Sequence, residues 1–270
     1  PLHNPANIMG VRAFAKELPD AIQVGVFDTA FSTSTLPEEN YIYAVPYEWY
    51  EKYGVRRYGY HGTSHRYIYK TICKHLEKDN LKVISCHIDN GNVVDTTLGF
   101  SSLVGLIMGT RCGDIDVAIV QYMMKKTGKS IDEVMDDLYK RSGLLGVSGI
   151  SSDSRDVETA AEEGNERAIL ANEMYAQKIA NYIAMYNNEL NGADVITLTA
   201  GVGENSKAMR KSIIQKIASL GVKLDEERND FRGEFRLIST DDSKIPVYVV
   251  PTDEEMEIAL ETYEIKTKNN

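Results

Sequence analysis

Short apolar runs rich in β-branched residues are the clearest pattern along the chain. They occupy residues 23–27, 83–87, 195–199 and 246–250. Turn-forming residues bound each run, and the runs are too short for helices. Each run therefore predicts a buried strand.

Helical periodicity fills much of the chain between these runs. Helices are predicted over residues 64–78, 115–126, 130–140, 160–190, 206–220 and from 253 to the C-terminal end. Two of them begin with capping boxes, Ser130 with Glu133 and Thr252 with Glu255, in which a hydroxyl and a carboxylate satisfy each other's backbone amides. Strands that alternate with helices predict the α/β class.

A hairpin is predicted over residues 83–97. Two apolar arms flank Asp89, Asn90 and Gly91, and an Asn-Gly pair favours a tight type I′ turn. We therefore expect two strands joined at this turn.

Composition narrows the class of protein. A chain of 270 residues can form one large or two modest domains. Its net charge of -10 argues against a general nucleic-acid or anionic-membrane binder. Cys73, Cys86 and Cys112 form no CxxC pair, which is typical of a reducing cytosol. Without an apolar run long enough for a membrane span, we expect a cytoplasmic protein. The start at Pro1 indicates a fragment or a processed product.

Two glycine-rich segments follow the predicted strands or precede helices. In VITLTAGVGENS a strand runs into Gly201 and Gly203, and a helix begins near Ser206. Such a turn lets backbone amides approach a phosphate, although an ordinary tight turn explains the pattern equally well. In GVSGISSDSRD, hydroxyl-bearing residues suit a ribose, and the alternative is a solvated loop.

The segment GTRCGDID places Arg111 between Gly109 and Gly113. An arginine held in a glycine loop is suited to clamping a phosphoryl group. Asp114 and Asp116 lie at the start of a predicted helix, and we expect them to complement its dipole.

Histidines and carboxylates give further candidates. His61 and His65 have a spacing that can hold a metal on one helical face, but Gly62 indicates that the helix begins after His61, which favours an anion contact for His61 instead. Asp28 ends the first predicted strand, where α/β proteins present carboxylates to ligands; a hydrogen-bonded structural role is the alternative. Glu254 opens a helix, and with Asp28 it would suffice for magnesium bound to phosphates.

Seven motifs, taken in order, resemble the acetate kinase family of short-chain carboxylate kinases. They are HNPANIMGVRA, FDTAF, RRYGYHGTSH, MGTRCGDID, SGLLGVSGISSDSRD, TAGVGENS and PTDEE. The resemblance implies an actin-like, sugar-kinase-like fold of two RNase H-like domains, normally a homodimer. It also implies ATP as co-substrate, magnesium, and reversible phosphoryl transfer from ATP to acetate that gives acetyl phosphate.

The same resemblance implies roles for individual residues. The family's catalytic positions fall on Asp28, Arg111 and His61, and its metal positions on Glu254 and Asp28. The remaining positions match nucleotide contacts: Asn90, Gly91, Asp153, Ser154, Arg155, Gly201, Val202, Gly203, Glu204 and Asn205. In a loose phosphoryl-transfer transition state, Arg111 and His61 would neutralise the equatorial oxygens, with no covalent intermediate.

The resemblance also implies a division of the chain into domains, and alternative functions stay open beside it. Residues 1–31 match the end of an N-terminal domain, 32–254 a C-terminal nucleotide-binding and dimerisation domain, and 255–270 a helix that returns to the first. The family's first quarter is absent, Asp89 replaces a glycine, Ser32 replaces a histidine, and Ser154 replaces an aromatic or apolar residue. We therefore expect a weak or inactive kinase. A noncatalytic nucleotide-binding or dimerisation module, a propionate or butyrate kinase, and a metal-dependent hydrolase using His61 and His65 are the alternatives.

Overall fold

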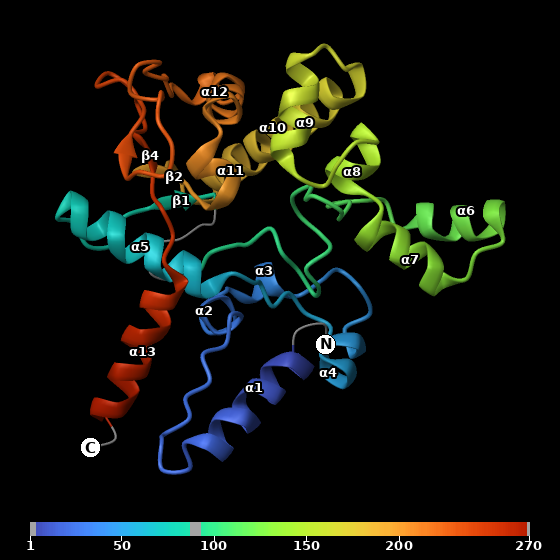
Figure 1. Cartoon of the computed structure of the whole chain (residues 1–270), viewed down its shortest axis with the longest axis vertical. Helices are drawn as coiled ribbons and strands as arrows, with labels where there is room; N and C mark the ends of the chain where they lie inside the picture. The colour runs from blue at the N-terminus through green and yellow to red at the C-terminus, as the bar shows by residue number, and fades with distance from the viewer. Residues whose placement is uncertain (1–3, 87–92, 269–270) are drawn as a thin grey trace.

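A four-stranded sheet forms the centre of the computed structural model, which describes residues 4–86 and 93–268 (Figure 1). The strand order is β1-β2-β4-β3. The bounds are β1 (Val83–Ser85), β2 (Val195–Leu198), β3 (Arg236–Leu237) and β4 (Val247–Val249). β1, β2 and β4 are parallel and buried along their whole length, whereas β3 pairs antiparallel to β4 at the edge. Buried parallel strands confirm the α/β class.

Helices cover both faces of this sheet. Because side chains alternate along a strand, Ile84 and Ile196 point to one face and Val83 and Val195 to the other. α10 (Glu166–Glu189) and α12 (Lys207–Lys216) pack with the first pair, and α5 (Gly62–Leu76) packs with the second.

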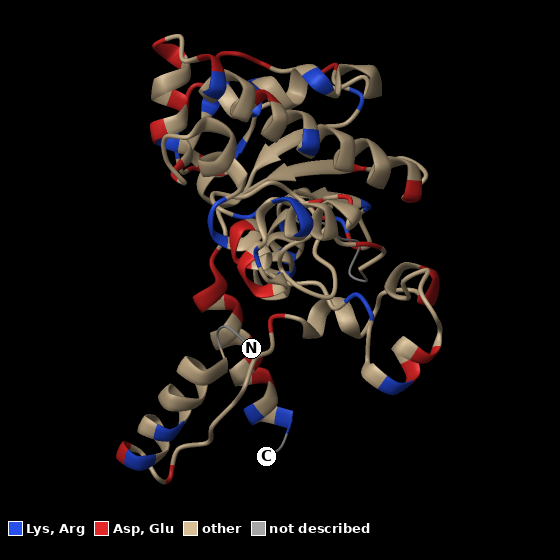
Figure 2. Ribbon diagram, turned by 90° about the vertical axis from the view of Figure 1, so that its right-hand side faces the viewer, with Lys and Arg blue, Asp and Glu red and all other residues tan. Residues whose placement is uncertain are grey.

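The remaining helices complete the fold, and acidic and basic residues are interspersed along them on the side seen in Figure 2. Their bounds are α1 (Asn4–Glu17), α2 (Ala30–Thr33), α3 (Glu38–Tyr41), α4 (Glu48–Tyr53), α6 (Ala118–Thr127), α7 (Ile131–Lys140), α8 (Gly143–Ser148), α9 (Ser154–Glu162), α11 (Ala200–Asn205), the 3₁₀ turn η1 (Ala218–Leu220) and α13 (Glu254–Lys268). α6 and α7 project from the body as an arm. Within the described ranges, no helix is long and apolar enough to cross a bilayer.

Several predicted elements are confirmed. β1, β2 and β4 lie within three of the four predicted strands, and α5, α6, α7, α12 and α13 lie close to predicted helices. The capping box at Ser130 forms as expected: its hydroxyl accepts from the Glu133 amide at 3.3 Å, and the Glu133 carboxylate accepts from the Ser130 amide at 2.8 Å.

The helix predicted over 160–190 is wrong as a single element. The structure has α9 and α10 separated at Gly164, whose φ is +89°. A left-handed residue ends one helix, and the Asn165 side chain then caps the next by accepting from the Ala168 amide.

The strand predicted over 23–27 is also wrong. In the described part of the chain these residues belong to no strand and are exposed or half-buried, and none of the four strands of the sheet pairs with them. Among the described residues of the second predicted hairpin arm, 93–96 likewise form no strand, and the turn at residues 89–91 lies outside the described residues.

The second predicted capping box is replaced by another cap. At the start of α13 the Asp253 carboxylate accepts from the Met256 amide at 2.9 Å. The Thr252 hydroxyl instead lies 2.6 Å from the Ser64 hydroxyl on α5. A tertiary contact has taken the group that the local pattern assigned to the helix.

Candidate active site

The start of α5 holds Asp28 and His61 together. The His61 amide donates to Asp28 Oδ2 at 2.6 Å, and the Gly62 amide donates to the Asp28 carbonyl at 2.8 Å. A Cβ on Gly62 would lie 2.4 Å from that carbonyl oxygen, so only glycine allows this approach. His61 has a φ of +61°, and both His61 and Asp28 are exposed. A non-glycine residue in the left-handed conformation beside an exposed carboxylate is a geometry that recurs at functional sites.

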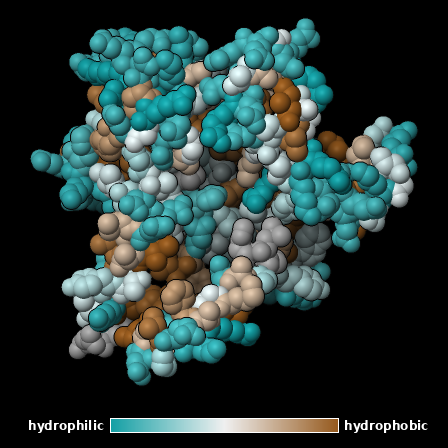
Figure 3. All heavy atoms as spheres, in the orientation of Figure 1, coloured by the Kyte–Doolittle hydropathy of each residue, from teal (hydrophilic) through white to brown (hydrophobic). Residues whose placement is uncertain are grey.

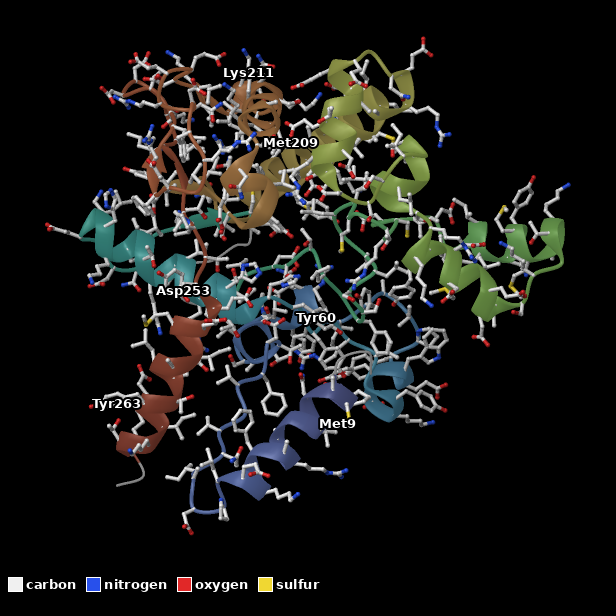
Figure 4. The ribbon with its side chains drawn as sticks, viewed as in Figure 1. Met9, Tyr60, Met209, Lys211, Asp253 and Tyr263 are labelled. Atoms are coloured by element: carbon white, nitrogen blue, oxygen red, sulfur yellow. The ribbon has the colours of Figure 1, made fainter. Side chains whose placement is uncertain are left out.

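The same end of α5 meets the start of α13. The Ser64–Thr252 contact joins the two helices there, and further along Lys70 pairs with Glu257. Figure 4 labels Asp253 where α13 begins, beside α5. Asp28 and Glu254, predicted to share a metal, thus lie on segments that meet at one helix start.

The glycine-rich segment 201–205 forms part of the helix α11 and not the predicted turn. The chain leaves β2 and turns at Ala200, with a φ of +58°, directly into the helix. α11 is tied to the PTDEE segment, because Glu204 Oε1 accepts from the Thr252 amide at 3.1 Å and from the Thr199 hydroxyl at 3.4 Å. As predicted, a new helix begins near Ser206, whose hydroxyl caps α12.

Arg210 supports α11 and was missed by the sequence analysis. Its side chain is fully buried, and Nη1 donates to the carbonyls of Gly203 and Glu204 at 3.1 and 3.0 Å. Its Nε and Nη2 donate to the side chain and carbonyl of Asn229, at 2.7 and 2.8 Å, and Nη2 also donates to the Phe231 carbonyl. Burial lowers the pKa of Arg210 to about 10.

A signal for Arg210 was present in the sequence. Ile213 and Ile214 follow it at helical spacing and are buried, so the periodicity of α12 places Arg210 on the buried face. An arginine at such a position needs several acceptors.

Three of the predicted nucleotide contacts, Asp153, Ser154 and Arg155, lie at the start of α9. Asp153 caps this helix by accepting from the Arg155 amide at 2.9 Å, and the Arg155 side chain also bonds to it. These hydrogen bonds lower the pKa of Asp153 to about 2. α9 is joined to the start of α12 because the Ser206 hydroxyl donates to Glu158 at 2.5 Å. The two predicted nucleotide segments are therefore linked.

Arg111 lies on a loop next to residues 153–155. A Cβ on Gly109 would lie 2.6 Å from the Ser152 carbonyl oxygen, so the two loops touch. The Arg111 side chain is half-buried, and its Nη1 donates to the Ser102 carbonyl at a long 3.3 Å. The backbone of the loop therefore sets the position of Arg111, because its guanidinium makes few contacts of its own.

The two aspartates after Arg111 have different roles. Asp116 accepts from the Ala118 amide at 2.9 Å at the start of α6, which confirms its predicted capping role. Asp114 does not complement that helix, and the prediction for it is wrong. Its carboxylate is bound to Lys178 and Tyr182 of α10 instead.

A cavity of about 190 Å³ opens beside His61. Its walls come from the region of α5, from β1, from residues 93–98, from residues 106–108 and from α10. Asp95 lies in this wall, where Arg57 donates to it at 2.7 Å and burial raises its pKa. Asn90 and Gly91, predicted to contact phosphate, lie outside the described residues.

The described histidines do not make a metal centre. His61 is exposed and precedes α5, whereas His65 is buried in its first turn. Across residues 4–86 and 93–268, no three His, Cys, Asp or Glu side chains are grouped so that they could hold a metal. Asp28 and Glu254 are both exposed carboxylates, and two carboxylates suit magnesium that also binds phosphate oxygens.

The chain is similar to acetate kinases and to a propionate kinase. A family model described as the acetokinase family matches residues 1–260. The acetate kinase of Clostridium novyi is 50% identical over 100% of this chain and 70% of its own length. A crystal structure of Porphyromonas gingivalis acetate kinase has a TM-score of 0.94 and 44% identity, covering 98% of this chain and 69% of that one. A propionate kinase from Francisella tularensis has a TM-score of 0.91 and 39% identity, covering 96% and 68%.

These matches extend over nearly the whole chain and include every segment that forms the site. The fold likeness is consistent with the actin-like type that the sequence predicted. The chain belongs to the acetokinase family.

Proposed function

We propose that this chain is an acetate kinase, which transfers the γ-phosphoryl group of ATP to acetate. The observation that carries the proposal is the meeting of the motif segments in space. Contacts run from Asp28 and His61 through Ser64 and Thr252 to Glu204, and from Ser206 to α9. The acetate kinase of Clostridium novyi is 50% identical over an alignment that covers the whole chain, and so covers these segments too.

In the proposed mechanism, Arg111 and His61 bind the oxygens of the transferring phosphoryl group. Phosphoryl transfer spreads charge over those oxygens, so fixed positive and hydrogen-bonding groups lower the barrier. Arg111 is held on a glycine-rich loop and His61 at the start of α5, and both supply such groups without covalent chemistry.

Magnesium fits the carboxylates at the start of α5 and α13. Asp28 uses one oxygen to accept from the His61 amide, and Glu254 is exposed at the first turn of α13. We propose that both residues hold the metal, directly or through water, with phosphate oxygens completing its shell. The bound metal would neutralise charge on the phosphates and align them.

The nucleotide is proposed to lie along the starts of α9 and α11. Asp153, Ser154 and Arg155 would contact the adenosine together with Gly201 to Asn205, and Asn90 and Gly91 would contact the phosphates. Residues 32–254 would then form the nucleotide-binding domain, with residues 1–31 and 255–270 outside it.

The acceptor is a short carboxylate, and we propose acetate. The propionate kinase among the similar structures favours propionate as the second candidate. One methylene in an apolar pocket changes selectivity by about 10- to 200-fold. Comparing kcat/KM for acetate, propionate and butyrate will therefore rank the acceptors.

We also propose a homodimer formed through the exposed apolar residues of the α6 arm and α10. Val117 and Tyr122 near or on α6, and Ile169 and Leu170 on α10, are exposed. Light scattering after size exclusion will give the oligomeric state, and Val117→Asp with Leu170→Asp is expected to yield monomers.

The test of function is acetyl phosphate formation from ATP, magnesium and acetate, trapped as the hydroxamate. Arg111→Ala should lower kcat by about 100- to 1000-fold, because a positive group at the transferring phosphate is lost. Arg141→Ala is the matched control, since Arg141 is an exposed arginine paired with Asp137, and its kcat should not change.

Three outcomes separate the alternatives. Activity that depends on Arg111 supports the proposed kinase and contradicts the expectation of an inactive chain. Bound ATP without phosphoryl transfer indicates the nucleotide-binding module. Activity that survives in Arg111→Ala contradicts the proposed role of Arg111.

A further inference from the structure

Asp114 lies at the centre of a cluster that joins the Arg111 loop to α10. Its Oδ2 accepts from the Tyr182 hydroxyl at 2.6 Å and lies 2.7 Å from Lys178 Nζ. Its Oδ1 accepts from the Gly105 amide at 2.9 Å. Lys178 and Tyr182 are one helical turn apart, so α10 presents both donors on one face.

The same aspartate closes the base of the loop. The Asp114 amide donates to the Gly105 carbonyl at 3.1 Å, so two bonds join the residues at which the loop begins and ends. Gly113 has a φ of +72°, and a Cβ there would lie 2.7 Å from the same carbonyl oxygen. The base is therefore closely packed, and the Asp114 carboxylate fixes it to α10.

Arg111 depends on this loop for its position. Its guanidinium has a 3.3 Å bond to the Ser102 carbonyl and a 3.8 Å contact with Met108 Sδ, both weak. The Arg111 carbonyl accepts from the Met108 amide within the loop, and the Thr110 carbonyl accepts from the Ser142 amide before α8. The tip is thus held on the α8 side, and Asp114 holds the base on the α10 side.

We propose that Asp114 is a positioning residue that, through Lys178 and Tyr182, fixes the loop that carries Arg111 for phosphoryl transfer. The inference rests on the proposed function. A displacement of about 1 Å at a reacting centre can cost about 100-fold in rate, so an anchor outside the site can control kcat.

The charge state of Asp114 suits this role. Burial by itself would raise its pKa, but hydrogen bonds from Lys178, Tyr182 and the Gly105 amide outweigh that effect and lower the pKa. The carboxylate therefore stays ionised at neutral pH and keeps all of its donors.

The first test compares Asp114→Asn with Asp116→Asn in acetyl phosphate formation. Asp116 is the matched control, because it lies two residues away and caps α6 without binding α10. We expect Asp114→Asn to lower kcat by about 10- to 100-fold, with the KM for ATP changed by less than about 3-fold. Asp116→Asn should stay within about 2-fold in both. An equal fall of kcat in the two variants, or no fall in Asp114→Asn, would overturn the proposal.

A second pair of variants tests whether the cluster acts as a unit. Tyr182→Phe removes one donor and should lower kcat less than Asp114→Asn does. The double variant should be no slower than Asp114→Asn alone, because residues in one network are not additive. Fully additive losses would contradict the shared anchor.

Amide hydrogen exchange gives a readout that does not need activity. Peptides covering residues 105–113 should exchange at least about 10-fold faster in Asp114→Asn and unchanged in Asp116→Asn. Unchanged exchange in Asp114→Asn overturns the proposal even in an active enzyme. If the unmodified chain forms no acetyl phosphate, the proposed function fails, and the exchange result alone then decides whether Asp114 anchors the loop.

Discussion

The sheet with its helices and the region of α1 contrast in how they use apolar residues. α10 has seven buried residues, and Ile84, Ile196 and Val247 are buried in the sheet against it. By contrast, no described residue of α1 is buried, and even its apolar side chains Met9 and Phe14 are 66% and 63% exposed. Figure 3 shows apolar residues at the surface in the lower part of the molecule, around α13 and the N-terminal segment.

This contrast teaches that an apolar residue stabilises a fold only where another surface covers it. The hydrophobic effect scales with the area removed from water, about 25 cal/mol per Å². Phe14 retains most of its exposure and contributes little, whereas Ile196 contributes fully. The segments of the candidate site adjoin helices that pack on the sheet, so the buried core fixes their positions.

The largest expected change in the free energy of unfolding comes from Arg210, the charged residue buried beside α11. Arg210→Met should lower the free energy of unfolding by about 4 kcal/mol, because buried carbonyls of Gly203, Glu204 and Asn229 lose their donor. Urea denaturation measures the change.

Arg236→Met is the matched control for this effect. The guanidinium groups of Arg210 and Arg236 lie 4.6 and 4.5 Å from the centre of the Phe231 ring, but the Arg236 side chain is 38% exposed and pairs with Glu234. Its loss should cost less than about 1 kcal/mol. Similar losses in the two variants would show that burial is not the decisive difference.

A second comparison uses one apolar substitution in each region and measures the free energy of unfolding that each one costs. Ile196→Ala should cost about 3 kcal/mol, because it leaves a cavity between the sheet and α10. Phe14→Ala removes a larger side chain but should cost less than about 0.5 kcal/mol, since Phe14 is exposed. Thermal and urea unfolding of both variants give the values. A large loss in Phe14→Ala would mean that α1 is covered in solution.

The smallest expected change in stability is at His61, which lies at the edge of the buried region. There a substitution should affect activity without lowering stability. His61→Gly should leave stability unchanged or raise it by up to about 1 kcal/mol, because glycine adopts the left-handed conformation without the cost of a Cβ. The kcat for acetyl phosphate formation should nevertheless fall, because the imidazole is lost.

His61→Ala is the control for His61→Gly. It removes the imidazole but keeps the Cβ, so it should lose activity equally and gain no stability. Unchanged kcat in both variants would remove His61 from the proposed catalytic residues.

The sequence determined the features that depend on neighbours along the chain. The capping box at Ser130 needs only Glu133 three residues later, and the runs at β1, β2 and β4 are apolar enough to be buried in any α/β arrangement. The ordered motifs identified the family and named Asp28, His61 and Arg111 as candidates. These predictions use covalent order and local hydrogen bonds.

The tertiary structure alone decided where distant groups meet. Thr252 bonds to Ser64, 188 residues away, and so leaves the cap of α13 to Asp253. Asp114 bonds to Tyr182, 68 residues away, in place of the helix it precedes. Residues 23–27 have a strand pattern but no neighbouring strand. A polar group bonds to the partner that packing brings nearest, and a strand forms only beside a hydrogen-bonded neighbour. Both partners come from distant parts of the chain, so the sequence around a residue does not specify them.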